Sequence, residues 1–204
     1  MGIQYDPVKR SLGSVFNSTP WLRVFFYKLL DLLLLRAWYI NKELRLWKKQ
    51  NPHATVLDAG SGFGQYVYRM AALAPQWQID GVEVKHEQID DCNNFFSKLD
   101  LQQRVRFSYA DLTSFQAPSK YKLILSVDVM EHILEDEKVF ENFYTSLQPG
   151  GMLLISTPSD QGGSDVHDHD HESFIDEHVR DGYNANDMRQ KLTAAGFSHI
   201  ETQY

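Results

Sequence analysis

Cysteine is almost missing from this chain, since Cys92 is the only one among 204 residues. A single cysteine excludes a disulfide framework and agrees with a reducing, cytoplasmic compartment. Internal repeats are missing too, and so is a long apolar run. Residues 21–40 are rich in leucine and aromatic side chains, but Lys28, Asp31 and Arg36 interrupt them. Because a transmembrane helix needs about 20 mostly apolar residues, we expect no span here. The segment also lies too far inside the chain, and lacks the small-residue cleavage site, for a signal peptide.

Charge is distributed unevenly, although its overall value is −7. Residues 1–50 hold nine lysines and arginines against three acidic residues, whereas the remainder holds 11 against 24. With 43% apolar residues, the chain can bury one substantial core. We therefore predict a basic and aromatic helical extension, residues 1–50, followed by a single acidic domain, residues 51–204.

The extension has two open interpretations. Pro20 at its start, with Asn51 and Pro52 at its end, brackets a helix or a pair of helices. In the first, these helices pack on the sheet or cover an active site. In the second, they lie in a membrane interface with basic residues toward anionic headgroups. The second interpretation predicts peripheral membrane contact through residues 20–50 and fits a lipid or prenylated substrate. DNA is not an expected partner, and RNA is disfavoured because the acidic domain repels phosphate.

The most informative stretch is a short apolar run, residues 56–59, that enters a glycine-rich turn. Gly60, Gly62 and Gly64 have the spacing G-x-G-x-G, and Asp58 precedes them. Glycines directly after a buried strand let the backbone turn tightly and approach a ligand. A dinucleotide site prefers G-x-G-x-x-G around a pyrophosphate, whereas an anionic Asp58 suits a cationic ligand group better than a phosphate. We expect a nucleotide-like cofactor at this turn.

Strand patterns alternate with helical patterns through the rest of the chain. Apolar runs predict strands at 56–59, 79–84, 105–112, 121–128 and 151–158, and three-to-four spacing predicts helices at 66–73, 88–99 and 138–147. A turn at 148–150 is expected to end the last of these helices. Alternation of this kind predicts an α/β fold with a mostly parallel sheet, which binds ligands at the carboxyl ends of its strands. The acids Asp58, Glu83, Asp111 and Asp128 all lie at such ends.

Glu83, 23 residues after Gly60, is placed to accept hydrogen bonds from both ribose hydroxyls, as an acid does in dinucleotide sites. From about residue 54 onward, the order of these motifs resembles the class I S-adenosylmethionine (SAM) dependent methyltransferases. Three short motifs are similar to those of the ubiquinone-biosynthesis methyltransferase group: the one around Glu131 and His132, residues 147–151 and residues 195–197. The resemblance implies a Rossmann-like fold and an adenine-binding role for Asp111. The chain departs from the family in one respect, because only residues 198–204 remain for the final antiparallel pair of strands.

The expected SAM-binding residues come from four strand ends: Asp58, Gly60, Ser61, Gly62, Phe63, Gly64, Glu83, Val84, Asp111, Leu112, Asp128 and Val129. Catalysis is assigned to His132 and Glu131, with His132 as a base. The sulfonium already activates the methyl group, so no nucleophilic side chain is required.

A divalent metal is the alternative reading of the same residues. On a helix opening after Asp128, that residue would share a face with Glu131 and His132, and His178 could join them. Small-RNA 2'-O-methyltransferases and ubiquinone-biosynthesis O-methyltransferases have a similar acid-x-x-Glu-His pattern. We do not favour a metal, because Asp128 can contact the cofactor while Glu131 stabilises a helix N-terminus.

Three alternating histidines, His167, His169 and His171, form a second candidate metal site. Their surroundings read as a polar loop after the fifth strand, so we interpret the segment as a lid over the substrate. The sequence thus predicts a SAM-dependent methyltransferase of a small-molecule or lipid-linked acceptor, with O-methylation slightly favoured. The alternatives are a metal-assisted RNA 2'-O-methyltransferase, a nicotinamide-dependent oxidoreductase and a non-catalytic SAM-binding regulator.

Overall fold

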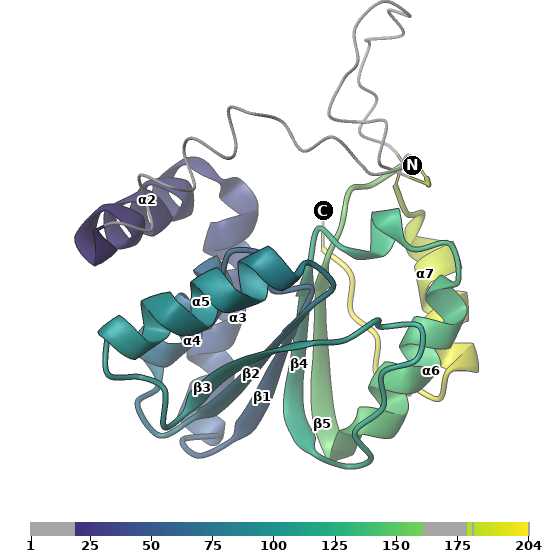
Figure 1. The fold of residues 1–204 in the computed structure, drawn as a ribbon. Helices are drawn as coiled ribbons and strands as arrows, with labels where there is room; N and C mark the ends of the chain where they lie inside the picture. Colours follow the sequence, from purple (N-terminus) through teal and green to yellow (C-terminus); the bar gives the residue numbers. More distant parts are fainter. Residues whose placement is uncertain (1–18, 161–178, 181, 204) are drawn as a thin grey trace, which may run out of the picture.

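A five-stranded sheet with the order β3-β2-β1-β4-β5 forms the centre of the protein, and all of its strand pairs are parallel (Figure 1). The computed structural model describes residues 19–160, 179–180 and 182–203. The strands are β1 Thr55–Ala59, β2 Gln78–Glu83, β3 Val105–Tyr109, β4 Tyr121–Val127 and β5 Leu147–Ser156. The helices are α2 Pro20–Leu33, α3 Leu35–Gln50, α4 Gln65–Leu73, α5 His86–Lys98, α6 Asp136–Ser146 and α7 Ala185–Ala194, with a 3-10 turn at Met130–His132. The predicted Rossmann-like α/β fold is confirmed.

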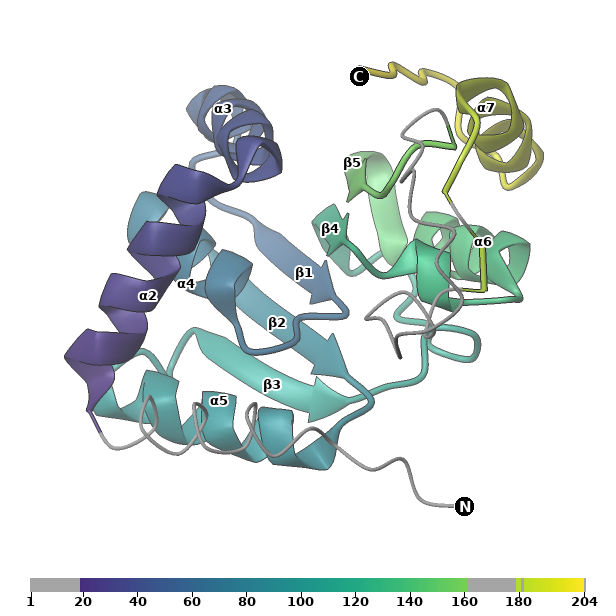
Figure 2. The same cartoon turned by 90° about the horizontal axis from the view of Figure 1, so that it is seen from above.

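Helices cover both faces of the sheet (Figure 2). Successive residues of β1 and β4 point to opposite faces, so Val56 and Leu123 enter the core under α2 to α5, whereas Leu57 and Ile124 enter the core under α6 and α7. All four of these side chains are fully buried. Burial of each one stabilises the fold by roughly 1.5–3 kcal/mol, which explains why these strands read as continuous apolar runs.

The fifth strand begins earlier than the sequence predicts. Residues 148–150 were expected to form a turn that ends a helix, but β5 already starts at Leu147. Tyr121 of β4 pairs with Leu147, and Leu123 pairs with Met152, so the residues between them bulge out of the strand. Gly150 has a φ of 72°, a conformation that glycine adopts easily. The turn residues therefore interrupt the strand pairing without ending it.

The extension folds as two helices, α2 and α3, which meet at the extended residue Leu34. Both lie on the same side of the sheet as α4 and α5 (Figure 2), and Tyr27, Ile40 and Leu44 join the core on that side. Across the described residues, every helix is too short or too polar to cross a membrane. The described C-terminal residues after α7 include no strand.

Candidate cofactor and acceptor site

Four acidic residues gather along the carboxyl edge of the sheet, as their positions at strand ends predict. Asp58 is the second-last residue of β1, Glu83 ends β2, and Asp128 directly follows β4. Asp111 comes two residues after β3. Because the strands are parallel, these ends share one edge, where ligands of open α/β sheets bind.

Backbone hydrogen bonds hold the glycine turn after β1 against the end of β2. The amides of Gly60 and Ser61 both donate to the Val82 carbonyl, at 3.0 and 2.9 Å. Gly60 has a φ of 78°, and a Cβ added there would lie 2.4 Å from Cγ2 of Val129. A Cβ on Gly62 would meet nothing within 4 Å. The turn therefore touches the segment after β4 at Gly60 and leaves open space at Gly62.

Asp58 is the most perturbed carboxyl group of the edge. Its side chain is 2% exposed, and its Oδ2 atom has no hydrogen-bond partner among the described residues. Burial, and then the negative charge of Glu83, raise its pKa to about 7, although a backbone hydrogen bond from Val67 lowers it. A buried carboxylate without a cation is costly, so this position is suited to a positively charged ligand group.

Two more buried polar groups near Asp58 also lack partners within the described part of the chain. These are the hydroxyl of Tyr66, one residue into α4, and the hydroxyl of Ser126 near the end of β4. Burial raises the pKa of Tyr66 to about 12, and the nearby charge of Arg36 opposes that rise. Buried polar groups are normally hydrogen-bonded, so unpartnered ones at a ligand-binding edge indicate that a polar ligand completes this region.

Glu83 is held in a fixed orientation at the tip of β2. Its Oε2 accepts from the Gly62 amide at 3.0 Å, and its Oε1 accepts from the amides of Val84 and Lys85 at 2.9 and 3.2 Å. A carboxylate oxygen can accept two hydrogen bonds, and Oε2 accepts only one here. The carboxylate is thus preorganised beside the glycine turn with acceptor capacity left, and its ribose-binding role stays a prediction.

Asp111 is exposed, and its neighbour Leu112 is buried in the core under α6 and α7. The Asp111 Oδ1 atom accepts from the amide and hydroxyl of Thr113 at 2.9 and 2.7 Å, and these bonds lower the Asp111 pKa. Sequence reasoning missed an aromatic pair nearby: the His86 ring stacks on Tyr109 with centroids 4.9 Å apart. The adenine-binding role of Asp111 stays a prediction.

The N-terminal helices contribute side chains that sequence reasoning missed. Arg36, at the start of α3, forms an ion pair with Asp128 at 2.8 Å. Asp128 itself has a φ of 53°, an uncommon conformation for a residue other than glycine. No local pattern signals this pair, because 92 residues separate its members.

A second contact joins α2 to the glycine turn. The carbonyl of Phe63 accepts from Nη2 of Arg23 at 2.6 Å and from the hydroxyl of Tyr27. Arg23 Nε also donates to that hydroxyl at 2.7 Å, and both side chains are buried. Since a charged donor strengthens a buried hydrogen bond, α2 fixes the position of the turn that should hold the cofactor.

The residues after β4 differ from their predicted arrangement. Met130–His132 form a 3-10 turn instead of the opening of an α-helix. Glu131 is 1% exposed and accepts from Thr157 Oγ1 at 3.1 Å, whereas His132 is exposed. The expectation that Asp128, Glu131 and His132 share one face is therefore wrong.

No group of three or more His, Cys, Asp or Glu side chains is placed to hold a metal ion in the described part of the chain. The other candidate ligands, His167, His169, His171 and His178, lie outside the described residues, as does the predicted lid.

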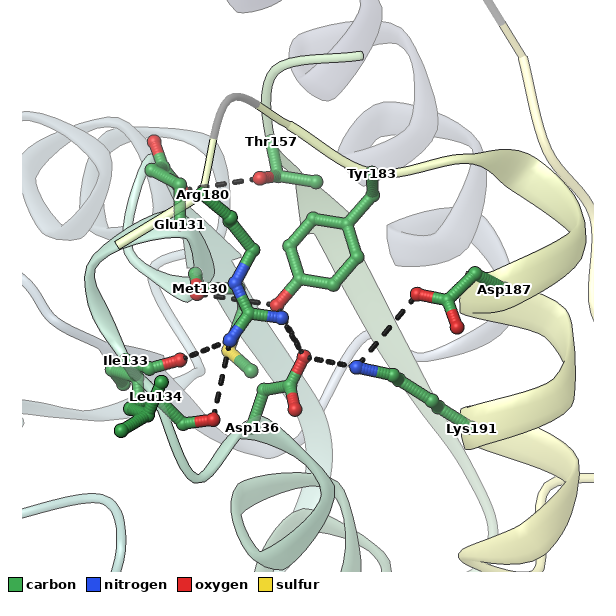
Figure 3. A network of polar contacts seen from close by, with 10 residues as sticks. All are labelled: Met130, Glu131, Ile133, Leu134, Asp136, Thr157, Arg180, Tyr183, Asp187 and Lys191. Carbon is green, nitrogen blue, oxygen red and sulfur yellow. Dashed lines mark hydrogen bonds and ion pairs between the residues drawn. The ribbon is translucent and has the colours of Figure 1, made fainter. Parts of the chain in front are cut away.

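A polar network fixes the 3-10 turn from the C-terminal side (Figure 3). The buried Asp136 accepts from the hydroxyl of Tyr183 and Nζ of Lys191, both at 2.8 Å, and from Arg180. These partners lower the pKa of Asp136 against the effect of burial. Arg180 also donates to the Ile133 carbonyl at 2.6 Å. The segment after residue 178 thus clamps the region that carries Glu131 and His132.

The comparisons with known proteins agree with this geometry. A sequence profile described as a methyltransferase domain matches residues 50–199. Malonyl-(acyl-carrier protein) O-methyltransferase 2 of Ilyobacter polytropus is 28% identical over 102 residues, which cover 50% of this chain and 38% of that protein. Phosphoethanolamine N-methyltransferase 1 of Zea mays is 29% identical over 156 residues, which cover 73% of this chain and 29% of that protein.

A solved structure shares the fold. Phosphoethanolamine N-methyltransferase 2 of Haemonchus contortus, in complex with S-adenosyl-L-methionine, superposes with a TM-score of 0.65 and 23% identity. The match covers 80% of this chain and 38% of that one. The chain therefore spans well under half the length of each of these three proteins.

Proposed function

The chain belongs to the family of class I, SAM-dependent methyltransferase domains, and from that premise we propose that it transfers a methyl group from SAM to a small-molecule or lipid-linked acceptor. SAM would bind at the carboxyl edge of the sheet, against the glycine turn of Gly60 to Gly64. The buried carboxylate of Asp58, whose Oδ2 atom has no hydrogen-bond partner among the described residues, is the observation that supports this most directly, because SAM carries the cationic groups that such a carboxylate needs.

SAM supplies a methyl group on a sulfonium, which is already electrophilic. The protein then has to hold the cofactor, orient the acceptor and exclude water. In this proposal Asp58 and Glu83 hold the charged and hydroxyl groups of the cofactor. The ion pair between Arg36 and Asp128 closes the edge from the side of α3, and Asp111 receives the adenine.

O-methylation is the finer part of the proposal. His132 is exposed next to the segment of Asp128 and Val129, so its imidazole can accept the proton of an acceptor hydroxyl. The oxygen–methyl bond forms while the sulfur–methyl bond breaks, and the proton passes to His132. Glu131 has a positioning role, because its buried carboxylate fixes the 3-10 turn through Thr157. Relatives named as O- and as N-methyltransferases both match the chain, so the acceptor atom needs a direct test.

A lipid-linked acceptor is the second finer part. Large apolar side chains of α2 and α3 are exposed, among them Trp21, Phe25 and Trp38. Exposed apolar groups beside basic residues are typical of helices that lie on a membrane. The single cysteine is buried and unpaired, which suits the reducing, cytoplasmic compartment in which we place the protein.

Calorimetry with S-adenosylhomocysteine, SAM and NAD tests the cofactor. Binding of both sulfur ligands is expected, and NAD binding without them would contradict the proposal in favour of an oxidoreductase. Isotopically labelled SAM, incubated with separate small-molecule, lipid and RNA fractions, then tests the acceptor. Label is expected in the small-molecule or the lipid fraction, and label in RNA alone would support the RNA methyltransferase.

Two controls separate the remaining alternatives. A protein that binds SAM but labels no fraction would be a regulator. If methyl transfer survives exhaustive chelation, the metal-assisted mechanism is excluded. His132→Gln should lower kcat more than it changes KM for SAM, because the imidazole acts on the acceptor hydroxyl and does not hold the cofactor.

A further inference from the structure

An open hollow of about 540 Å³ lies beside the N-terminal helices. None of the predicted SAM-binding residues lines it. The lining residues come from α2, α3 and α4: Asp31, Trp38, Asn41, Lys42, Arg45, Leu46, Lys49 and Arg69. The hollow combines four cationic side chains with one carboxylate and two large apolar side chains, so its composition favours an amphipathic anion.

Two of the three lining cations of α3 are available to such an anion, whereas Lys42 forms an ion pair with Glu43 at 3.8 Å. Lys42, Arg45 and Lys49 follow one another at three- and four-residue spacing, which places them on one side of the helix. Asp31 is already paired with Arg69 of α4. In the part of the chain that the structure describes, Arg45 and Lys49 have no ion-pair partner. The hollow therefore presents a net positive charge, although the protein as a whole has a net charge of −7.

Asn41 adds a second, independent feature. It is 8% exposed, and its amide oxygen has no hydrogen-bond partner among the described residues. An unpartnered buried amide is unfavourable, and it sits in the wall of the hollow beside the three cations. A ligand that brings a hydroxyl group together with a phosphate would satisfy the amide and the cations at once.

Large apolar side chains are exposed on α2 and α3, the helices that supply most of the lining of the hollow. Nine large apolar side chains of α2 and α3 are at least 37% exposed: Trp21, Phe25, Leu29, Leu32, Leu33, Leu35, Trp38, Tyr39 and Leu46. Trp38 and Leu46 belong both to this apolar surface and to the hollow. In Figures 1 and 2, α2 lies on the outside of the helical layer, away from the sheet. An anion held in the hollow therefore has apolar side chains next to it.

We propose that the hollow binds the phosphate headgroup of an anionic phospholipid in a bilayer, while the apolar surface of α2 and α3 enters the acyl boundary. Charge complementarity selects this occupant, because an apolar surface bordered by lysine and arginine matches an anionic membrane rather than a neutral one. This deepens the membrane contact proposed above, but it requires neither SAM nor methyl transfer.

Vesicle co-sedimentation of the full chain tests the proposal. At 0.1 M salt, binding is expected to phosphatidylcholine vesicles that contain phosphatidylglycerol, and to be much weaker with phosphatidylcholine alone. The double substitution Arg45→Gln and Lys49→Gln should lower the partition coefficient roughly 30-fold. A matched control, Lys98→Gln with Arg106→Gln, removes the same charge from α5 and β3 and should leave binding nearly unchanged.

A second pair separates the apolar contribution from charge. Trp21→Ser with Phe25→Ser keeps the net charge and should also release the protein from the vesicles. Soluble glycerol phosphate at millimolar concentration should compete only weakly, because it lacks the acyl boundary. Strong competition by glycerol phosphate would overturn the bilayer proposal in favour of a soluble phosphate ester.

Other outcomes would also overturn it. One is equal binding to both kinds of vesicle. Another is an equal loss of vesicle binding in the Arg45→Gln, Lys49→Gln variant and in its Lys98→Gln, Arg106→Gln control. A third is a dimer, detected by light scattering, that becomes a monomer in the Trp21→Ser, Phe25→Ser variant. Binding of transfer RNA that depends on Arg45 and Lys49 would instead identify a nucleic-acid surface. Calorimetry with S-adenosylhomocysteine on the same variants keeps the two proposals apart, since cofactor binding should persist in each of them.

Discussion

Replacing Asp58 with asparagine removes a buried negative charge while nearly keeping the shape of the side chain. The carboxyl pKa rises from its ordinary value of 3.8 to about 7 in the folded chain, chiefly because the group is buried. One pKa unit corresponds to about 1.4 kcal/mol, so ionised Asp58 destabilises the ligand-free fold by about 4 kcal/mol. Asp58→Asn should therefore stabilise the ligand-free protein at pH 8.

The dependence on pH has a definite sign. The unfolded chain releases this proton near pH 3.8, whereas the folded chain keeps it until about pH 7. The stabilising contribution of protonated Asp58 is complete below pH 3.8 and is lost as the pH rises through 7. Relative to the wild type, the free energy of unfolding of Asp58→Asn should be higher by about 2 kcal/mol at pH 5 and by about 4 kcal/mol at pH 8.

Urea denaturation of the ligand-free protein at several pH values measures this gain. Asp111→Asn is the matched control, because it removes an acid of the same edge that is exposed and whose pKa is lowered by Thr113. The control should not stabilise the fold at pH 8. An Asp58→Asn protein that is no more stable than the wild type at pH 8, or whose gain does not grow with pH, would refute the reasoning.

Cofactor binding should change in the opposite direction. A cationic ligand binds the ionised form of Asp58, so wild-type affinity for SAM should rise with pH up to about 7, by at most tenfold per pH unit. Asp58→Asn should bind SAM at least tenfold more weakly and with little dependence on pH. Calorimetry in buffers of different ionisation enthalpy counts the proton that wild-type Asp58 releases.

Three further substitutions test other parts of the site. Gly60→Ala should lower the free energy of unfolding by about 1–3 kcal/mol more than Gly62→Ala, because only the first would press a Cβ against Val129; urea midpoints compare them. Tyr27→Phe should lower the free energy of unfolding by about 1 kcal/mol and weaken SAM binding several-fold in calorimetry, because the hydrogen bond from the Tyr27 hydroxyl to the Phe63 carbonyl is removed. Asp136→Asn should cost about 3 kcal/mol at pH 7. Since the pKa of Asp136 is lowered, this loss should shrink as the pH falls below 4, which thermal unfolding against pH would show.

The sheet and its acidic edge were predictable because their signals are local. Central parallel strands are buried on both faces and so leave apolar runs, and Asp58, Glu83 and Asp128 mark where three of those runs stop. The ion pair between Arg36 and Asp128 was not predictable, because it joins elements that only the folded chain brings together. The burial of the Tyr66 hydroxyl was not predictable either, because it also depends on how the folded chain packs around α4.

The 3-10 turn shows how a long-range contact overrides a local helical pattern. The sequence from Asp128 to His132 reads as the opening of a helix. In the structure, the Met130 carbonyl accepts from the hydroxyl of Tyr183, and the Ile133 carbonyl accepts from Arg180. Those donors come from more than 45 residues away. They replace the hydrogen bonds of a continuing helix, and α6 begins only at Asp136.

The helix α2 reverses the usual orientation of an amphipathic helix. Its periodicity predicts a helix, and the usual rule places the apolar side toward the core. In the structure the buried residues of α2 are Arg23 and Tyr27, whereas Trp21 and Phe25 are more than 60% exposed. The inner side carries two donors to the Phe63 carbonyl of the glycine turn, although Tyr27 also joins the core and Val24 packs against it. The requirement to hold the cofactor turn therefore sends the apolar side of α2 outward, where it forms the surface that we assign to the membrane.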